Sequence, residues 1–404
     1  MIVLTGATGF VGSQLMRRLA VRNDLLLVSR DPQAASRRFP GVAVCDYAML
    51  PDHDLTGALF IHLAARNNDR PGTLQEFRAA NVDALLAVAA VARDRGASCF
   101  VNLCSTHALN ARSDDHYGLS KAEGAHALAA LWPERAVNLY VPAIYGDHFR
   151  GRLAVLDRLP AATRPPALGL LRQIKPLISI DHLLAVLLEC ADRPASDAPW
   201  QSEQYAADPV GHFGVFPAIK RAIDLLAVLA VVMLLGWLML ILALYIRIDS
   251  RGPAIFAQPR VGREGRIFTC YKFRTMAVGT AHAATHDVAA TAVTAAGRLL
   301  RRTKLDELPQ IVNVLLNEMS LVGPRPCLPL QAELIALRRR RGVLRLKPGI
   351  TGLAQVGDID MSDPARLAAW DDRYRAFRTL LGDVAILLRT VLGSGSGDRI
   401  VSPR

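Results

Sequence analysis

The pattern of apolar and polar positions divides this chain into two halves of different character. In residues 1–207, short apolar runs such as 2–4, 25–28 and 59–65 alternate with longer stretches of helical periodicity. Short buried strands that alternate with helices are typical of α/β proteins with a parallel sheet. We therefore predict an α/β fold for residues 1–207, with a doubly wound parallel sheet.

A long apolar segment marks the change between the halves. Residues 225–245 contain no charged side chain, and these twenty-one positions are enough to cross a bilayer core or to enter it and return. Beyond Arg247 the chain becomes basic and helix-rich, with irregular Gly/Pro loops. We predict a linker at 208–219, a membrane-associated helix at 220–247 and a small helix-rich α/β domain at 248–404.

Composition narrows the class of protein. A chain of 404 residues that is 51% hydrophobic fits two or three domains. Its net charge of +12 fits binding to nucleic acid, to anionic lipid or to phosphorylated substrates. Neither zinc-finger spacing nor an aromatic-interleaved basic patch is present, so we predict no nucleic-acid partner. The six cysteines fall singly, which predicts reduced thiols in an intracellular protein, and Met1 leads directly into the first apolar run, so we expect no signal peptide. The basic run 338–341 is predicted to be a solvated or lipid-facing helix surface.

The first half opens with a glycine motif between a strand and a helix. Gly6, Gly9 and Gly12 have the spacing that lets a pyrophosphate approach a helix N-terminus. With the strand order that follows, this half resembles the extended short-chain dehydrogenase/reductase family, the NAD(P)-dependent epimerases and dehydratases of nucleotide sugars. The resemblance implies a Rossmann-like fold.

It also implies a set of cofactor-binding residues: Gly6, Gly9, Gly12, Arg30, Asp46 and Ala64. Members that prefer NAD usually carry an acidic residue after the second strand. Arg30 stands there in this chain, and a guanidinium suits the 2′-phosphate of NADP. We therefore predict NADP in preference to NAD.

The family's catalytic residues also have counterparts. Tyr117 and Lys121 lie four apart, on one face of a predicted helix, and Thr106 in preference to Ser105 would be the third member. In the family the tyrosine exchanges a proton with the sugar oxygen as hydride moves. An ordinary surface pair of Tyr and Lys is the alternative. Because this half ends near residue 207, the substrate pocket is expected to be reduced.

Two adjacent carboxylates are the most informative feature of the second half. Asp306 and Glu307 lie between a basic run that includes Arg301 and a Pro/Gly-bounded loop that carries Arg325. Carboxylates bind Mg²⁺ or attack phosphorus, while Arg and Lys neutralise the phosphates that approach them. A simple surface ion pair between Asp306 and Arg302, four residues earlier, is the alternative.

Residues from about 216 to 391 resemble the bacterial sugar transferase family, the monotopic polyprenyl-phosphate sugar-1-phosphate transferases. The resemblance implies transfer of a sugar 1-phosphate from a UDP-sugar to polyprenyl phosphate, with release of UMP. Asp306 would be the nucleophile, and Glu307 would hold Mg²⁺. The implied phosphate-binding residues are Lys272, Arg274, Arg301, Arg325 and Lys347.

The same resemblance bears on topology. Basic residues flank both ends of the apolar segment, at Lys220 and Arg221 and again at Arg247 and Arg251, and a straight span would place one flank outside the cell. The family solves this with a re-entrant helix that commonly bends at Ser-Pro. Here Gly236 and Trp237 take that place, and glycine permits a bend without imposing one. We predict a re-entrant helix in the bacterial inner membrane with both halves in the cytoplasm; a straight spanning anchor is the alternative.

Together the halves predict a bifunctional enzyme in which an NAD(P)-dependent reductase or epimerase makes the UDP-sugar that the transferase consumes. In one alternative the first half is a non-catalytic nucleotide-binding module. In another the chain is a membrane-anchored dehydrogenase whose basic half only binds lipid. The sequence does not name the sugar, and the resemblance also allows a homodimer.

Overall fold

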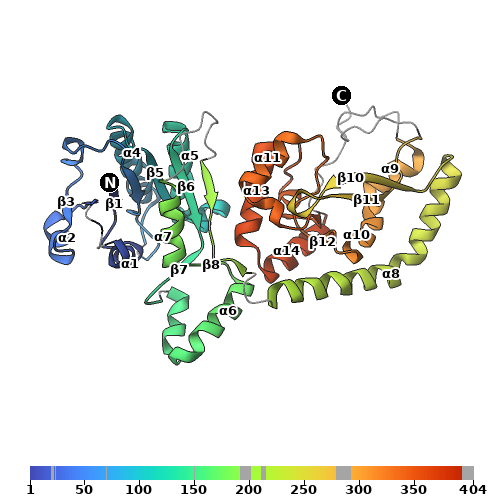
Figure 1. The fold of residues 1–404 in the computed structure, drawn as a ribbon, viewed down its shortest axis with the longest axis horizontal. Helices are drawn as coiled ribbons and strands as arrows, with labels where there is room; N and C mark the ends of the chain where they lie inside the picture. Colours follow the sequence, from blue (N-terminus) through green and yellow to red (C-terminus); the bar gives the residue numbers. More distant parts are fainter. Residues whose placement is uncertain are drawn as a thin grey trace. The chain divides into compact units, whose positions relative to one another are not determined.

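The computed structural model describes the chain except residues 20, 21, 23, 70, 150, 192–201, 211–214, 279–292 and 394–404. The chain divides into two compact units, Met1–Pro209 and Val210–Arg404 (Figure 1). Asp208, which we expected to open the linker, is buried in the first unit, where it accepts hydrogen bonds from Tyr145, Ser179 and His182. The linker call also included residues 211–214, which lie outside the described residues.

A parallel seven-stranded sheet forms the first unit. Its strand order is β3-β2-β1-β4-β5-β6-β9, and the order 3-2-1-4-5-6 is that of the Rossmann fold. The predicted α/β fold with a doubly wound sheet is therefore confirmed. The strands of this sheet are β1 (Ile2–Thr5), β2 (Leu25–Val28), β3 (Ala43–Cys45), β4 (Leu59–His62), β5 (Cys99–Ser105), β6 (Ala136–Val141) and β9 (Glu203–Tyr205).

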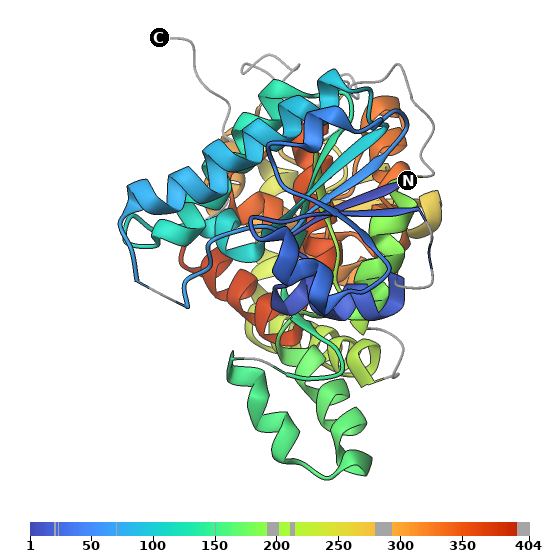
Figure 2. The ribbon, with the colours of Figure 1, turned by 90° about the vertical axis from the view of Figure 1, so that its left-hand side faces the viewer.

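Helices cover both faces of this sheet (Figure 2). Leu15 of α1 and Leu183 of α7 belong to the apolar core on one face, and Leu85 of α4 and Leu128 of α5 to the core on the other. The helices of the unit are α1 (Phe10–Leu19), α2 (Pro32–Arg38), α3 (Leu74–Arg78), α4 (Ala84–Asp94), α5 (His116–Leu131), α6 (Arg164–Ile174) and α7 (Ile180–Glu189). Shorter 3₁₀ turns are η1 (Leu50–Asp52), η3 (Thr106–Asn110), η4 (Gly151–Arg158) and η5 (Ala161–Thr163), with a π turn at η2 (Ala79–Asp83).

A small lobe is inserted after β6. Strands β7 (Ala143–Tyr145) and β8 (Leu177–Ser179) pair in parallel at its base, and η4, η5 and α6 lie between them in the chain. Its own apolar core contains Tyr145, Leu153 and Leu156. Figure 2 shows this helical arm projecting from the sheet. The reduced substrate pocket expected for this unit stays a prediction.

The second unit begins with one long helix, α8 (Val215–Asp249). Its most apolar 18-residue window has a mean hydropathy of 3.0 and is only 11% buried. The helix starts within the stretch expected to be linker. Although α8 is continuous in its hydrogen bonding, Figure 1 shows it bent near its middle. In the second half of this helix the Trp237 indole Nε1 donates to the Leu234 carbonyl oxygen at 2.8 Å.

Both ends of α8 pack against the same globular domain. In its first half Val228 joins a core with Ile311, and near its end Ile246 joins a core with Phe273.

The remaining elements are β10 (Ile255–Val261), η7 (Arg263–Gly265), β11 (Ile267–Phe273), α9 (Ala295–Thr303), η9 (Leu305–Gln310), α10 (Ile311–Leu315), β12 (Ser320–Val322), α11 (Ala332–Arg340), η10 (Val343–Arg345), β13 (Gly349–Thr351), α12 (Leu353–Val356), α13 (Pro364–Phe377) and α14 (Leu380–Val391). All six cysteines are buried and free of disulfides, in keeping with the sequence prediction.

Candidate active site

The glycine loop of the first unit closes tightly on the sheet. Gly6 has a φ of 74°, a left-handed conformation that favours glycine, and a Cβ there would lie 2.7 Å from the Ala64 nitrogen. A Cβ at Gly12 would overlap the Gly6 carbonyl oxygen. The Gly9 N–H donates to the Gly6 carbonyl oxygen at 3.1 Å. The loop thus precedes α1 in the arrangement that dinucleotide-binding folds use for a pyrophosphate.

Two further cofactor candidates lie at the carboxyl ends of neighbouring strands. Arg30 is exposed just after β2, and Asp46 follows β3, where its Oδ1 accepts a hydrogen bond from the Met49 N–H at 2.7 Å. Because ligands of parallel α/β sheets bind at this edge, both side chains are placed where a nucleotide would lie.

Ser105, rather than Thr106, lies next to Tyr117, the candidate catalytic tyrosine of the first unit. The Tyr117 hydroxyl is hydrogen-bonded with the Ser105 side chain, whereas Thr106 begins the turn η3. Burial raises the pKa of Tyr117 to about 12, and the bond with Ser105 acts in the opposite direction. Lys121 is buried on the same helix, its Nζ donates to Asn102 Oδ1 at 3.5 Å, and burial lowers its pKa. The last residue of β5, rather than the next one, is thus bonded to Tyr117, which makes Ser105 a stronger candidate than Thr106 for the third member.

In the second unit, a sharp chain reversal presents the acidic pair. Helix α9 ends at Lys304, which has a φ of 57°, and η9 begins at the next residue. A left-handed backbone is uncommon for a residue other than glycine, and such conformations concentrate at functional sites. Asp306 and Glu307 therefore lie in a turn packed against β11 rather than on an open helix face.

The two carboxyl groups have different electrostatic environments. Glu307 Oε1 accepts hydrogen bonds from Lys272 Nζ at 3.1 Å and from Arg325 at 3.0 Å. Burial acts to raise the pKa of Glu307, but the two cations outweigh it and lower the pKa to about 2. Burial and the charge of Glu307 instead raise the pKa of Asp306 to about 6. Neighbouring carboxyl groups whose pKa values are pushed apart are typical of sites with divided chemical roles.

These surroundings contradict the surface-pair alternative. Arg302 is exposed, whereas Asp306 and Glu307 are half-buried. The charges of Lys272, Arg301 and Arg325 all act on Asp306, and Arg301 Nε is held by Thr275 Oγ1 at 3.0 Å. Three of the predicted phosphate-binding cations are thus gathered around the acidic pair.

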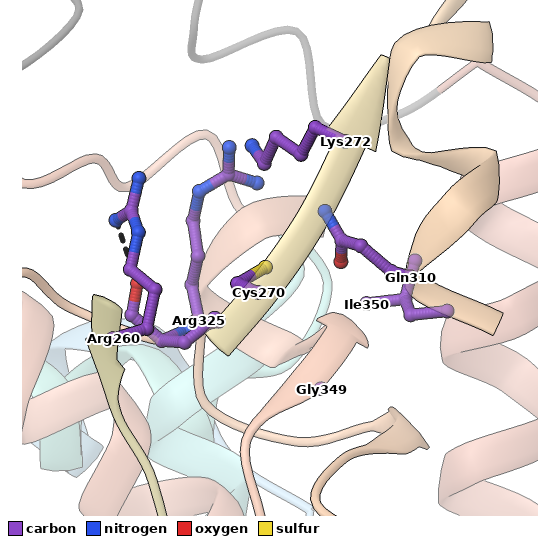
Figure 3. Close-up of a pocket in the computed structure, with 8 residues that line it drawn as sticks. Arg260, Cys270, Lys272, Gln310, Arg325, Gly349 and Ile350 are labelled. Carbon is purple, nitrogen blue, oxygen red and sulfur yellow. Dashed lines mark hydrogen bonds between the residues drawn. The ribbon is translucent and has the colours of Figure 1, made fainter. Parts of the chain in front are cut away.

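A pocket opens beside this pair (Figure 3). Its described lining residues are Arg260, Cys270, Lys272, Gln310, Arg325, Pro326, Gly349 and Ile350. Figure 3 shows the side chains of Arg260 and Arg325 extending side by side, with the Lys272 side chain reaching from β11 toward the Arg325 guanidinium. Arg260 and Gln310 were not among the predicted site residues. The antiparallel register of β10 with β11 could have indicated Arg260, because directly paired residues share a face and Arg260 pairs with Phe268, two positions before Cys270.

Two predicted phosphate-binding residues are placed elsewhere. Arg274 is buried and donates to the carbonyl oxygens of Ser250 and Arg251, so it holds the chain that leaves α8. Lys347 Nζ donates to Asn317 Oδ1, and burial followed by the charge of Arg221 lowers its pKa. The described contacts of Arg274 are thus internal, and Lys347 is not among the residues that line the pocket, so a phosphate-binding role stays a prediction for both.

The basic run on α11 is also more buried than its charge suggested. Arg338 is buried, pairs with Asp371 at 2.7 Å and donates to the Arg325 carbonyl oxygen at 2.8 Å. An uncompensated buried charge is costly, so each member of this pair depends on the other. The backbone of Arg325 is thereby fixed from below the pocket, which the sequence alone did not indicate.

The residues around Asp306 and Glu307 offer few protein ligands for a magnesium ion. Among the described residues there is no group of three or more His, Cys, Asp or Glu side chains that could hold a metal. Mg²⁺ commonly uses only one or two carboxylates together with substrate phosphates and water. Both described hydrogen bonds of Glu307 go to Oε1, so Oε2 of this ionised carboxylate fits such a role.

Comparison with known proteins agrees with the division of the chain. Residues 215–395 match the family model described as bacterial sugar transferase, and residues 2–179 match the NAD dependent epimerase/dehydratase family. The exopolysaccharide production protein PSS of Rhizobium leguminosarum bv. phaseoli is 36% identical over 43% of this chain and 94% of that protein. This chain belongs to the bacterial sugar transferase family.

Two further relatives of the family carry more specific names. The undecaprenyl-phosphate glucose phosphotransferase of Komagataeibacter xylinus is 33% identical over 52% of this chain and 48% of that protein. The UDP-glucose:undecaprenyl-phosphate glucose-1-phosphate transferase of Caulobacter vibrioides is 38% identical over 43% of this chain and 68% of that protein. The match spans about half or less of the first curated relatives' own length.

Proposed function

We propose that the second unit transfers a sugar 1-phosphate from a UDP-sugar to polyprenyl phosphate, the undecaprenyl carrier in bacteria, and releases UMP. The observation that carries this proposal is the acidic pair beside a pocket lined by three cations, in which the pKa of Asp306 is raised and that of Glu307 is lowered. The names of the family relatives supply the substrate class. A panel of UDP-sugars assayed for UMP release, with and without polyprenyl phosphate, tests it.

The chemistry proceeds in two displacements at one phosphorus. An oxygen of Asp306 forms a bond to the phosphorus attached to the sugar, and the bond from that phosphorus to the bridging oxygen breaks, so its electron pair leaves with UMP. A phosphate oxygen of the lipid then attacks the same phosphorus and frees the Asp306 carboxylate. Two polyanions thus visit the pocket in turn, and one difficult step becomes two easier ones.

The surrounding residues bind and orient the substrate. Lys272 and Arg325, together with Arg301, supply positive charge to the phosphorus under attack, while their bonds to Glu307 keep that carboxylate ionised. Mg²⁺ held in part by Glu307 would offset charge on the diphosphate. Arg301, which lies by Asp306 on α9, is our choice for the polyprenyl phosphate.

We further propose that α8 enters the inner membrane and returns, with both units in the cytoplasm. Lys220 near the start of α8 donates to the Val322 carbonyl oxygen, and Arg274 binds the carbonyl of Ser250 just past its end, so both ends are fastened to one domain. The middle of α8 is exposed, with Met233 at 73% and Leu240 at 75%. A helix whose two ends hold the same water-facing domain does not place them on opposite sides of a bilayer.

Labelling of single cysteines in intact cells tests this topology. Asp94 in the first unit and Glu264 after α8 have exposed side chains, and we expect cysteine at either position to react only after the membrane is opened. Gly236→Leu is a matched control, because a Cβ there would meet only Val232 at 3.9 Å, and it should leave both sites protected. Reaction of either cysteine from outside intact cells would instead establish a spanning helix.

For the first unit we propose NADP(H) binding and reduction or epimerisation of a nucleotide sugar. Support comes from the glycine loop, from Arg30 at the end of β2, and from the half-buried Tyr117 and Ser105 together with the buried Lys121. The short lobe and the raised pKa of Tyr117 favour a second candidate, a nucleotide-binding module without catalysis. A homodimer stays a prediction.

Cofactor preference can be changed at one position. If the Arg30 guanidinium meets the 2′-phosphate, Arg30→Asp should weaken NADP(H) binding by about 10- to 100-fold, because a charged hydrogen bond is lost and a repulsive charge gained, while NAD(H) binding improves. Calorimetric titration of both dinucleotides measures the two affinities. Arg37→Gln on the neighbouring helix α2 is the control. No binding of either dinucleotide to the unaltered chain would contradict both proposals for this unit.

A further inference from the structure

One cation of the pocket has no role in the chemistry above. Arg260 lies on β10 with its guanidinium among the pocket-lining groups. Its NH1 donates to the Pro326 carbonyl oxygen at 3.0 Å and its NH2 to Gln258 Oε1 at 2.7 Å, while Nε is buried with no hydrogen-bond partner in the described part of the chain. Both of its acceptors are neutral.

The other cations of the pocket differ in this respect. Lys272 and Arg325 both bind Glu307, whereas the described ion pairs include none that involves Arg260. Burial, and then the charge of Arg325, lowers the pKa of Arg260, so the local structure makes its positive charge costly. A charge that is largely removed from water is normally paired, and here the charge of Glu307 acts on Arg260 but no described ion pair joins a carboxylate to it.

The geometry points to an anionic group of the substrate as the missing partner. Figure 3 shows Arg325 between Arg260 and Lys272, and both Lys272 and Arg325 bind Glu307, so the three cations form a row with Arg260 at the end away from Lys272. A nucleotide diphosphate places its two phosphates side by side in such a row. If the phosphate on the sugar lies at Asp306, the second phosphate, which bears the nucleoside, lies farther along it.

We propose that Arg260 binds the phosphate that departs with UMP, and so stabilises the leaving group. This inference rests on the proposed function. When the bond to the bridging oxygen breaks, its electron pair and negative charge stay on the nucleotide phosphate, where a fixed guanidinium gains most. The hydrogen bond that Arg260 NH2 donates to Gln258 Oε1 holds the Arg260 guanidinium in place before the substrate arrives.

Binding of UMP and of uridine to the full-length chain in lipid nanodiscs tests this role. Arg260→Gln should weaken UMP binding by about 10- to 100-fold, the usual effect of one charged hydrogen bond, and leave uridine binding unchanged. Arg260→Lys keeps the charge, so its affinity for UMP should lie between the affinities of Arg260→Gln and of the unaltered chain. Arg340→Gln removes an exposed arginine of α11 and should change neither affinity.

Two results would overturn the inference. Equal UMP affinity in Arg260→Gln and the unaltered chain would show that Arg260 does not meet the phosphate. Equal losses for UMP and uridine would show that Arg260 only supports the loop at Pro326; if Arg260→Gln binds neither because it does not fold, the same ratio is measured in Arg260→Lys. Failure of the unaltered chain to bind or release UMP would instead reject the proposed function itself.

Discussion

Replacing Asp306 by Asn is expected to abolish UMP release, with a loss on the order of 10³-fold or more, as for the removal of other enzymatic nucleophiles. The amide keeps the size of the side chain but does not form the bond to phosphorus. The loss should be complete even in a single turnover without polyprenyl phosphate. UMP released from each candidate UDP-sugar is the quantity to measure.

Two variants make this result specific. Glu307→Gln removes the charge that Lys272 and Arg325 share, so activity should weaken and the requirement for Mg²⁺ should rise, without the complete loss seen for Asp306→Asn. Glu333→Gln alters an exposed carboxylate on α11 and should behave as the unaltered chain. Substantial activity in Asp306→Asn would reject the covalent assignment.

Tyr117→Phe should lower nicotinamide turnover by the first unit about 100-fold or more, because it removes the group that exchanges a proton with the sugar. Cofactor binding should survive, since the glycine loop and Arg30 are untouched. Absorbance of the reduced nicotinamide with candidate UDP-4-keto sugars measures turnover, and calorimetry measures binding. Thr106→Val is the matched control, because Ser105 rather than Thr106 contacts Tyr117.

The two explanations of the first unit separate on this experiment. Turnover that is lost in Tyr117→Phe and kept in Thr106→Val supports an enzyme. Dinucleotide binding without turnover in the unaltered chain supports a nucleotide-binding module, and UMP release by the second unit should then respond to the dinucleotide.

Local sequence patterns were sufficient for the sheet and for the acidic pair. Strands β1, β2 and β4 at the centre of the first unit are short, apolar and fully buried, so their apolar runs were enough to locate them. The acidic pair stands out because two adjacent carboxylates beside several cations are rarely needed for folding. Neither feature depends on contacts between distant parts of the chain.

The contacts of several other residues depend instead on how distant parts of the chain meet. Arg274 looks like a phosphate ligand because it follows Lys272 by two residues, but the chain leaving α8 folds back and takes its guanidinium for backbone carbonyls. The place of Arg260 beside the pocket follows from the pairing of β10 with β11. Gly236 was predicted only to permit a bend; a side chain would fit there, and the described side-chain hydrogen bond in this part of α8 comes from Trp237.

The most direct test of the transferase mechanism is the mass of the intact protein after incubation with the UDP-sugar that best supports UMP release, in the absence of polyprenyl phosphate. We expect one sugar phosphate added per chain, located on the peptide that contains Asp306, together with one UMP released, and no addition in Asp306→Asn. An unmodified chain that releases UMP only when polyprenyl phosphate is also present would contradict a covalent intermediate.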